Sequence, residues 1–142
     1  MKRIDSRACL AAALLMVLIG CQATDPTYRR QRLLELYPPG QTTRAQVQEK
    51  FSNYKMSQLS AIRTESGWNY EQQGVQARAM NDASIRSGVR ASENRTGKEV
   101  YRCDCYWSPD PRASSPASLC FCWFYYDQHD ILLDAEWQYA SD

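Results

Sequence analysis

The sequence contains a single histidine, His129, and little else that is typical of an active site. A catalytic triad needs a nucleophile and an orienting acid near its base, and no spacing around His129 supplies them, so we expect a solvated turn residue. Asp134 and Glu136 share one face of a predicted strand, where paired carboxylates usually solubilise the surface. The chain has no glycine-rich phosphate loop and no dense basic cluster. We therefore expect neither an enzyme nor a nucleic-acid-binding protein.

Long apolar runs are also scarce, and the one that exists lies at the start of the chain. It extends from Ala8 to Ile19 and follows the basic residues Lys2, Arg3 and Arg7. This run is too short for a transmembrane helix and is typical of an export signal.

The apolar run ends in Leu18-Ile19-Gly20-Cys21, which resembles the lipobox of bacterial lipoproteins. The resemblance implies removal of residues 1–20, lipidation of Cys21 and anchoring to a membrane by acyl chains. An ordinary signal peptide followed by a chance cysteine is the alternative. Gln22 after the cysteine is similar to the outer-membrane address of enteric lipoproteins, so we expect a periplasmic-side location on the outer membrane.

Four cysteines remain once Cys9 leaves with the signal and Cys21 takes lipid, and they form two Cys-x-Cys pairs. An even number in an exported chain predicts disulfides. Side chains two apart on a strand share a face, and opposed residues of an antiparallel hairpin have a constant sum of residue numbers. A sum of 225 predicts the disulfides Cys103–Cys122 and Cys105–Cys120.

Two other uses of these cysteines fit the spacing less well. Structural zinc sites usually draw on Cys-x₂₋₄-Cys knuckles, and redox-active thiols lie at helix N-termini. We therefore expect neither a metal nor another cofactor.

The pattern of apolar residues predicts an α+β fold. Strands are predicted over 100–107, 119–126 and 131–139, and together they give a three-stranded antiparallel sheet. Helices are predicted over 27–37, 43–51 and 54–63, with the N-terminal helices packed on one face of the sheet. We expect a signal peptide over 1–20, a lipidated tether with room for one short helix over 21–40, and the folded domain over 41–142.

The second predicted helix carries a further resemblance. Thr43 and Gln46 form a capping box, and Thr43, Val47, Phe51 and Ser52 are similar to the opening helix of the SmpA/OmlA family of outer-membrane lipoproteins. Gly40 lies one residue too far upstream, and no Gly-x-Pro follows the helix. Trp68-Asn69-Tyr70 resembles the start of that family's first strand. The resemblance implies a part in an envelope complex, with barrel assembly as the example.

A ridge of aromatic residues is predicted on one face of the central strand. Phe121, Trp123 and Tyr125 alternate along it, and charged residues of the neighbouring strands surround them. A half-exposed aromatic surface with a polar rim is typical of a recognition surface. The alternative is that residues 72–97, either a mobile excursion or a poorly amphipathic helix, or else the N-terminal helix cover the ridge.

Charge is divided unevenly along the chain. Residues 22–103 carry 13 basic and 8 acidic side chains, a net charge of +5, whereas residues 104–142 carry 1 basic and 7 acidic, a net charge of −6. The favoured interpretation is that the two halves pack together through complementary charges. The alternative is a dipolar surface that orients a partner or an anionic membrane.

Two functions fit these features. The first is a lipid-anchored structural or adaptor protein of the outer membrane, with an envelope protein as its partner. The second is a ligand-binding or exclusion lipoprotein that uses the aromatic ridge to bind a glycan, a peptide or another protein.

Overall fold

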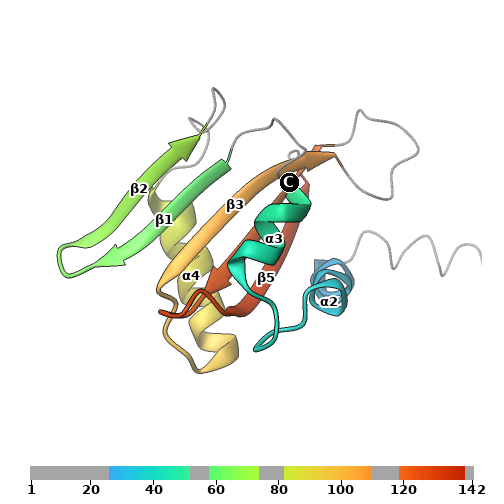
Figure 1. Cartoon of the computed structure of the whole chain (residues 1–142), viewed down its shortest axis with the longest axis horizontal. Coiled ribbons are helices and arrows are strands. Elements are labelled where there is room, and N and C mark those ends of the chain that lie inside the picture. The colour runs from blue at the N-terminus through green and yellow to red at the C-terminus, as the bar shows by residue number, and fades with distance from the viewer. Residues whose placement is uncertain (1–25, 52–57, 74–81, 110–118, 140–142) are drawn as a thin grey trace, which may run out of the picture.

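The computed structural model describes residues 26–51, 58–73, 82–109 and 119–139. In these residues three helices cover a five-stranded antiparallel sheet, so the predicted α+β class is confirmed. The strand order is β2-β1-β3-β4-β5 (Figure 1). The prediction of three strands was wrong because residues 58–73 add a β-hairpin to one edge of the sheet.

The first two helices lie where the sequence predicted them. Helix α2 (Pro26–Leu36) begins at a proline, which is favoured at the first helical position because its missing N–H is not needed there. Helix α3 (Arg44–Phe51) has the predicted capping box. The Thr43 N–H donates to Gln46 Oε1 at 2.8 Å, and the Gln46 N–H donates to Thr43 Oγ1 at 3.4 Å.

Helix α2 is part of the packed domain, although the sequence assigned it to a tether. Leu33 is only 5% exposed and belongs to the same buried cluster as Val47 of α3. Leu36, three residues further along the helix, is 60% exposed. The burial of Leu33 shows that ordered packing begins well before residue 41.

The helix predicted over 54–63 is not formed in its described part, residues 58–63. Strand β1 (Gln58–Thr64) pairs there with β2 (Gly67–Gln73), which contains the Trp68-Asn69-Tyr70 segment. Gly67 has a φ of +126°, and this position in the turn therefore favours glycine. The helix prediction failed because β1 is covered on both faces, so the adjacent residues Leu59, Ser60 and Ala61 are all buried and show no strand-like alternation.

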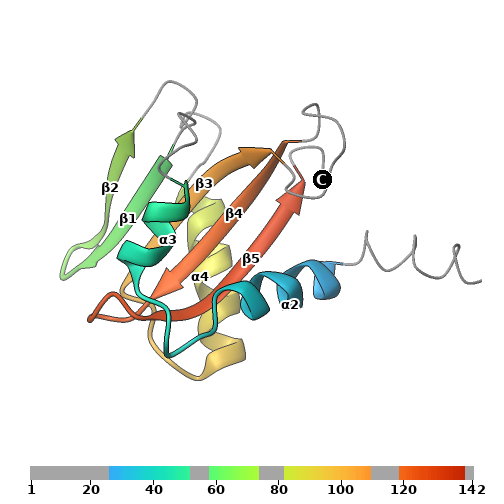
Figure 2. The same ribbon diagram turned by 45° about the vertical axis from the view of Figure 1, so that its right-hand side comes forward.

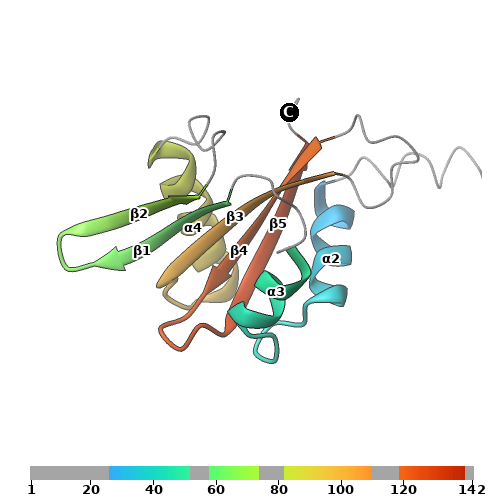
Figure 3. The same cartoon turned by 45° about the horizontal axis from the view of Figure 1, so that its top comes forward.

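Helix α4 (Asp82–Thr96) is the main element that the sequence did not resolve. It buries Ile85 and Val89 and continues through Gly88 without a break. Figures 1 and 3 show α3 and α4 on opposite sides of the sheet. The N-terminal helices do pack on one face, but the other face is also covered.

The remaining strands match their predicted positions closely. They are β3 (Arg102–Pro109), β4 (Leu119–Tyr126) and the edge strand β5 (Leu132–Tyr139). Figure 2 shows the strands spread apart along the sheet, with α2 running beside β5. The start of β5 is hydrogen-bonded to the segment before α3, because the Leu132 N–H donates to the Thr42 carbonyl at 2.9 Å.

The pairing of β3 with β4 differs from the predicted one. Tyr106 lies opposite Cys122 and Cys105 opposite Trp123, so opposed residue numbers sum to 228 instead of 225. An odd difference turns one strand over relative to the other. The observed register places the fully buried Asp104 on the side of α3, where Arg44 binds it.

Strands β4 and β5 pair along most of their length, with a register shift between Tyr125 and Tyr126. Phe124 lies opposite Ala135 and Cys122 opposite Trp137. These residues form one buried cluster with α2 and α3, whereas Trp123 and Tyr125 form a second cluster with α4. The sheet therefore has a buried core on each of its two faces.

Candidate functional site

The predicted aromatic ridge lies under helix α4. Trp123 is 7% exposed and Tyr125 is 1% exposed, while Phe121 is partly buried against the same cluster. The expected half-exposed surface is therefore wrong, and the alternative that residues 72–97 cover it is what the structure contains. The charged residues around the ridge bind the helix that covers it. Glu136, for example, pairs with Arg95 of α4.

Helix α4 approaches the ridge closely at Gly88. A Cβ at this position would lie 2.4 Å from the hydroxyl oxygen of Tyr125, so only glycine fits without movement. That hydroxyl donates to Glu136 Oε2 at 3.2 Å. Burial raises the pKa of Tyr125 well above its ordinary value, and the nearby charges raise it further. Tyr125 is therefore a neutral hydrogen-bond donor at any physiological pH.

A groove of about 530 Å³ remains between α4 and the last two strands. Its helix wall is made of small residues, and the sheet side contributes two aromatic rings, a carboxylate and an amide. The lining residues are Ala83, Ser84, Ser87, Gly88, Ala91, Trp123, Tyr125, Glu136 and Gln138. The two rings are almost fully buried and offer little exposed surface for stacking.

A carboxylate at the sheet edge joins the two helical layers. Asp134 of β5 is fully buried, and its Oδ1 accepts from Arg30 of α2 at 2.6 and 3.0 Å. Its Oδ2 accepts from Arg95 of α4 at 2.7 and 2.9 Å. We call Arg30, Arg95 and Asp134 the edge clamp. Buried charges are tolerated when they are paired and hydrogen-bonded in this way.

Glu136 extends the edge clamp. It pairs with Arg95 at 2.5 Å and also accepts from Tyr125. Burial lowers the pKa of Arg95, but the hydrogen bond to Asp134 and the charge of Glu136 outweigh that effect, and the pKa is raised overall. Asp134 and Glu136 were expected to solubilise the surface. They instead hold α2 and α4 against β5.

A hollow of about 310 Å³ lies beside the edge clamp. Its lining combines the start of α2, the end of α4 and the last part of β5, namely Thr27, Arg30, Arg95, Glu136, Trp137 and Gln138. Glu136 and Gln138 also line the larger groove, so the two hollows adjoin at β5. The two arginines that line the smaller hollow, Arg30 and Arg95, are already bound by Asp134 and Glu136.

A second buried carboxylate, Asp104, anchors helix α3. Arg44 Nε donates to Asp104 Oδ2 at 2.6 Å, and Ser60 Oγ donates to Oδ1 at 2.7 Å. Burial lowers the pKa of Arg44, but the hydrogen bond to Asp104 and its charge outweigh this, so the pKa is raised overall. At the sheet end, Arg102 pairs with Asp130 at 2.9 Å.

These ion pairs confirm the complementary packing predicted from the uneven charge. Asp104, Asp130 and Asp134 belong to the acidic C-terminal part, and the arginines that bind them all lie at or before residue 102. The sequence indicated that the halves would attract each other. It did not indicate which arginines would do so, since Arg30 and Arg95 lie 104 and 39 residues from Asp134.

The two predicted disulfides are absent from the structure. Cys103, Cys105, Cys120 and Cys122 are all buried, and none of them is joined in a disulfide. The observed register puts the first two on the α4 side of the sheet and the last two on the opposite side. Burial raises the pKa of the Cys103 and Cys105 thiols well above the ordinary value, and therefore they stay protonated. The four cysteines act as small apolar core residues.

The other predicted site residues are placed as follows. His129 is exposed in the turn before β5, where its N–H donates to Asp127 Oδ1 at 2.8 Å, so the predicted solvated turn is confirmed. Cys21 lies outside the described residues. In the part of the chain that the structure describes, no three His, Cys, Asp or Glu side chains are grouped so as to hold a metal ion.

None of the helices within residues 26–51 and 82–96 is both long and apolar enough to cross a membrane. In comparisons with known proteins, no family model matches the chain, and neither a curated protein nor a solved structure matches it.

Proposed function

We propose that this chain is a non-enzymatic, lipid-anchored structural or adaptor protein on the periplasmic side of the outer membrane. The leader over residues 1–20 and the lipobox cysteine Cys21 support the anchor. The observation that carries the proposal is the position of α2. This helix begins five residues after Cys21 and is fixed to β5 by Leu33 and by the pair of Arg30 with Asp134. A domain attached so closely to its anchor is suited to work at the membrane surface.

The use of buried charge supports a structural or adaptor role. Asp104 and Asp134, both fully buried, are bound by arginines from helices on either face. These contacts fix the helices to the sheet and leave a rigid module. A rigid, membrane-held module offers its outer surfaces to a partner, and we propose an envelope protein, with the barrel-assembly machinery as the first candidate.

Affinity capture from detergent-solubilised membranes tests the adaptor role. The acylated chain should retain a defined set of envelope proteins, and reciprocal capture with one of them should return the chain. Cys21→Ser is the control, because it removes acylation and should reduce the yield of the complex. Recovery of the acylated chain alone, at several detergent strengths, would argue against an adaptor.

A second function is favoured by the groove beneath α4. Its volume of about 530 Å³ falls in the range of small-ligand sites. Two polar side chains, Glu136 and Gln138, and two aromatic ones, Trp123 and Tyr125, contribute to its lining. Ser87→Leu should fill the groove, whereas Asn94→Leu places the same side chain elsewhere on α4. Glycan or peptide binding by the mature chain that Ser87→Leu abolishes and Asn94→Leu preserves would support this function.

A further inference from the structure

The outer side of α2 carries an unusual share of the exposed apolar surface. Three large apolar side chains are exposed in the described residues: Tyr28 by 40%, Leu36 by 60% and Tyr101 by 42%. Two of them lie on α2. They are eight residues apart, which places them on adjoining parts of one helix side and about 12 Å apart along the axis.

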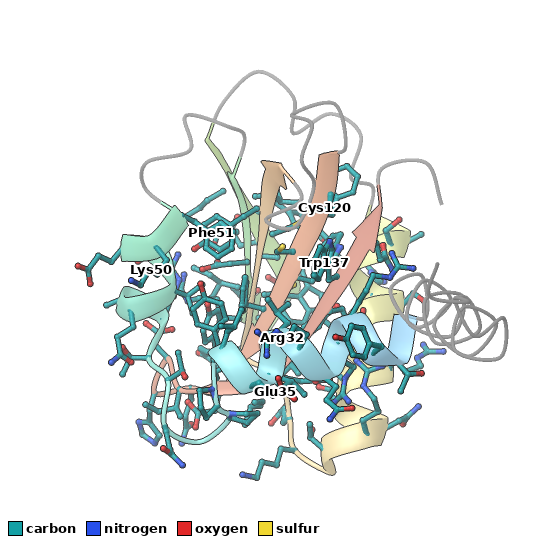
Figure 4. The ribbon with its side chains drawn as sticks, turned by 90° about the vertical axis from the view of Figure 1, so that its right-hand side faces the viewer. Arg32, Glu35, Lys50, Phe51, Cys120 and Trp137 are labelled. Atoms are coloured by element: carbon teal, nitrogen blue, oxygen red, sulfur yellow. The ribbon has the colours of Figure 1, made fainter. Side chains whose placement is uncertain are left out.

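The residues between Tyr28 and Leu36 leave this side with no net charge. Arg32 donates to Glu35 at 2.8 Å, and the side chains are 53% and 50% exposed. Figure 4 shows both residues on α2, on the side of the molecule turned toward the viewer. An internally paired arginine and glutamate can approach a charged surface without a net electrostatic penalty, and a long arginine stem covers apolar surface. We call Tyr28, Arg32, Glu35 and Leu36 the outer face of α2.

The outer face of α2 has a fixed direction. Arg30, which is about 160° from Arg32 around the helix axis, is bound to the fully buried Asp134, and Leu33 is buried against the sheet. Rotation of α2 about its axis would break both contacts. The direction of the outer face is therefore set by the fold of the whole domain.

The chain before α2 is too short to hold this face far from a membrane. Only residues 22–25 lie between Cys21 and Pro26, which makes five residue steps from one to the other. A fully extended chain spans at most about 3.6 Å per residue, so α2 begins within about 18 Å of a lipidated Cys21. That distance is less than two helix diameters. We propose that, in the anchored protein, the outer face of α2 lies on the bilayer, with Tyr28 at the headgroup level and Leu36 against the acyl chains. This rests on the proposed lipidation of Cys21.

The chemistry of the two residues fits that placement. A tyrosine ring with its hydroxyl is suited to the headgroup region, and leucine is favoured on the buried side of interfacial helices. Two such contacts bind weakly on their own. They are sufficient to orient a domain that acyl chains already hold at the surface, and they would fix which surfaces the domain presents to the periplasm.

Hydroxyl-radical labelling with mass spectrometry tests the placement, because Tyr28 and Tyr101 are nearly equally exposed. In the mature chain made without lipid, the ratio of Tyr28 to Tyr101 labelling should be close to one. In the acylated chain in vesicles of phosphatidylethanolamine and phosphatidylglycerol, the ratio should fall several-fold. Leu36→Glu should raise it again, whereas Asn94→Glu, the same substitution on the exposed side of α4, should not.

Other results would overturn the proposal in distinguishable ways. A ratio near one in vesicles, with acylation of Cys21 verified by mass, would refute docking of α2 and leave the anchor intact. A low ratio in native membranes but not in vesicles would assign the outer face to a protein partner. Absence of acyl groups on Cys21 would refute the anchor itself.

Discussion

Arg30 and Arg95, which lie on helices that cover opposite faces of the sheet, bind the two oxygens of one carboxylate, that of Asp134. The edge clamp therefore couples both helical layers to β5. The same carboxylate also binds a backbone donor of the edge strand, because Asp134 Oδ1 accepts from the Ala135 N–H at 2.9 Å. An inward-pointing charge at a sheet edge discourages pairing with another chain.

Asp134→Asn should destabilise the fold markedly. The substitution leaves two partly buried arginines without a charged partner at this position, and removal of one member of a buried pair costs about 3–5 kcal/mol. We expect the lower end of that range, because the two arginine side chains are about one-third exposed. Urea unfolding measures the change in the free energy of unfolding.

Asp130→Asn is the matched control for that measurement. Asp130 also pairs with an arginine, but its side chain is 47% exposed, and exposed pairs contribute about 0–1 kcal/mol. Its φ of 58° is tolerated by asparagine. Equal losses in the two variants would contradict the assigned role of the edge clamp.

Gly88→Ala should destabilise the contact between α4 and the ridge. The added methyl group would meet the Tyr125 hydroxyl at 2.4 Å, and overpacking of this kind costs about 1–3 kcal/mol. Tyr125→Phe removes the hydroxyl, so the double variant should recover most of the loss. A double-mutant cycle in urea measures the coupling. Losses that simply add would show that α4 does not approach Tyr125 so closely.

Stability should fall at alkaline pH. Burial raises the pKa of Cys103, Cys105, Tyr106, Tyr125 and Tyr126 in the folded state. In the unfolded chain these groups ionise near pH 8.5 for cysteine and near pH 10 for tyrosine. Above those values the folded state holds more protons, so the free energy of unfolding decreases, by up to about 1.4 kcal/mol per pH unit and group.

Urea unfolding between pH 8 and 10.5 tests this dependence. Tyr125→Phe should reduce the slope above pH 10, whereas His129→Gln, at an exposed turn residue, should leave it unchanged. A flat profile would indicate that the tyrosines and thiols are open to solvent.

Mass mapping of the unreduced protein should find four free thiols. Cys103 and Cys122 lie on opposite faces of the sheet, and disulfide geometry requires Cβ atoms about 3.8 Å apart. Alkylation should be slow in the native state and complete after unfolding. Peptides joined through Cys103 and Cys122 would contradict the register of β3 and β4 and restore the one predicted from sequence.

The sequence was informative where local chemistry decides the structure. The capping box of Thr43 and Gln46 and the alternation of aromatic residues along β4 each act over a few residues, and each predicted its element correctly. The unequal charge of the two halves predicted their attraction. This attraction joins residues that are far apart in the sequence, yet the charge composition of the two halves was enough to predict it.

The errors came from contacts that are distant in the sequence. The residue-number rule for hairpins allows several registers, and the choice depended on the burial of Asp104 beside Arg44 and Ser60. Helix α4 was difficult to recognise because the wall it presents to the groove is made of small residues. The ridge was assigned to solvent since nothing local indicated that Gly88 would allow a helix to cover Tyr125.

Acylation of Cys21 is the central claim of the functional account, and intact-mass analysis of the protein isolated from membranes tests it most directly. We expect a chain that begins at Cys21, lacks residues 1–20 and carries the added mass of a lipid. The Cys21→Ser chain should retain the leader and carry no lipid. A wild-type chain that retains residues 1–20, or that begins elsewhere without an acyl group, would contradict the account.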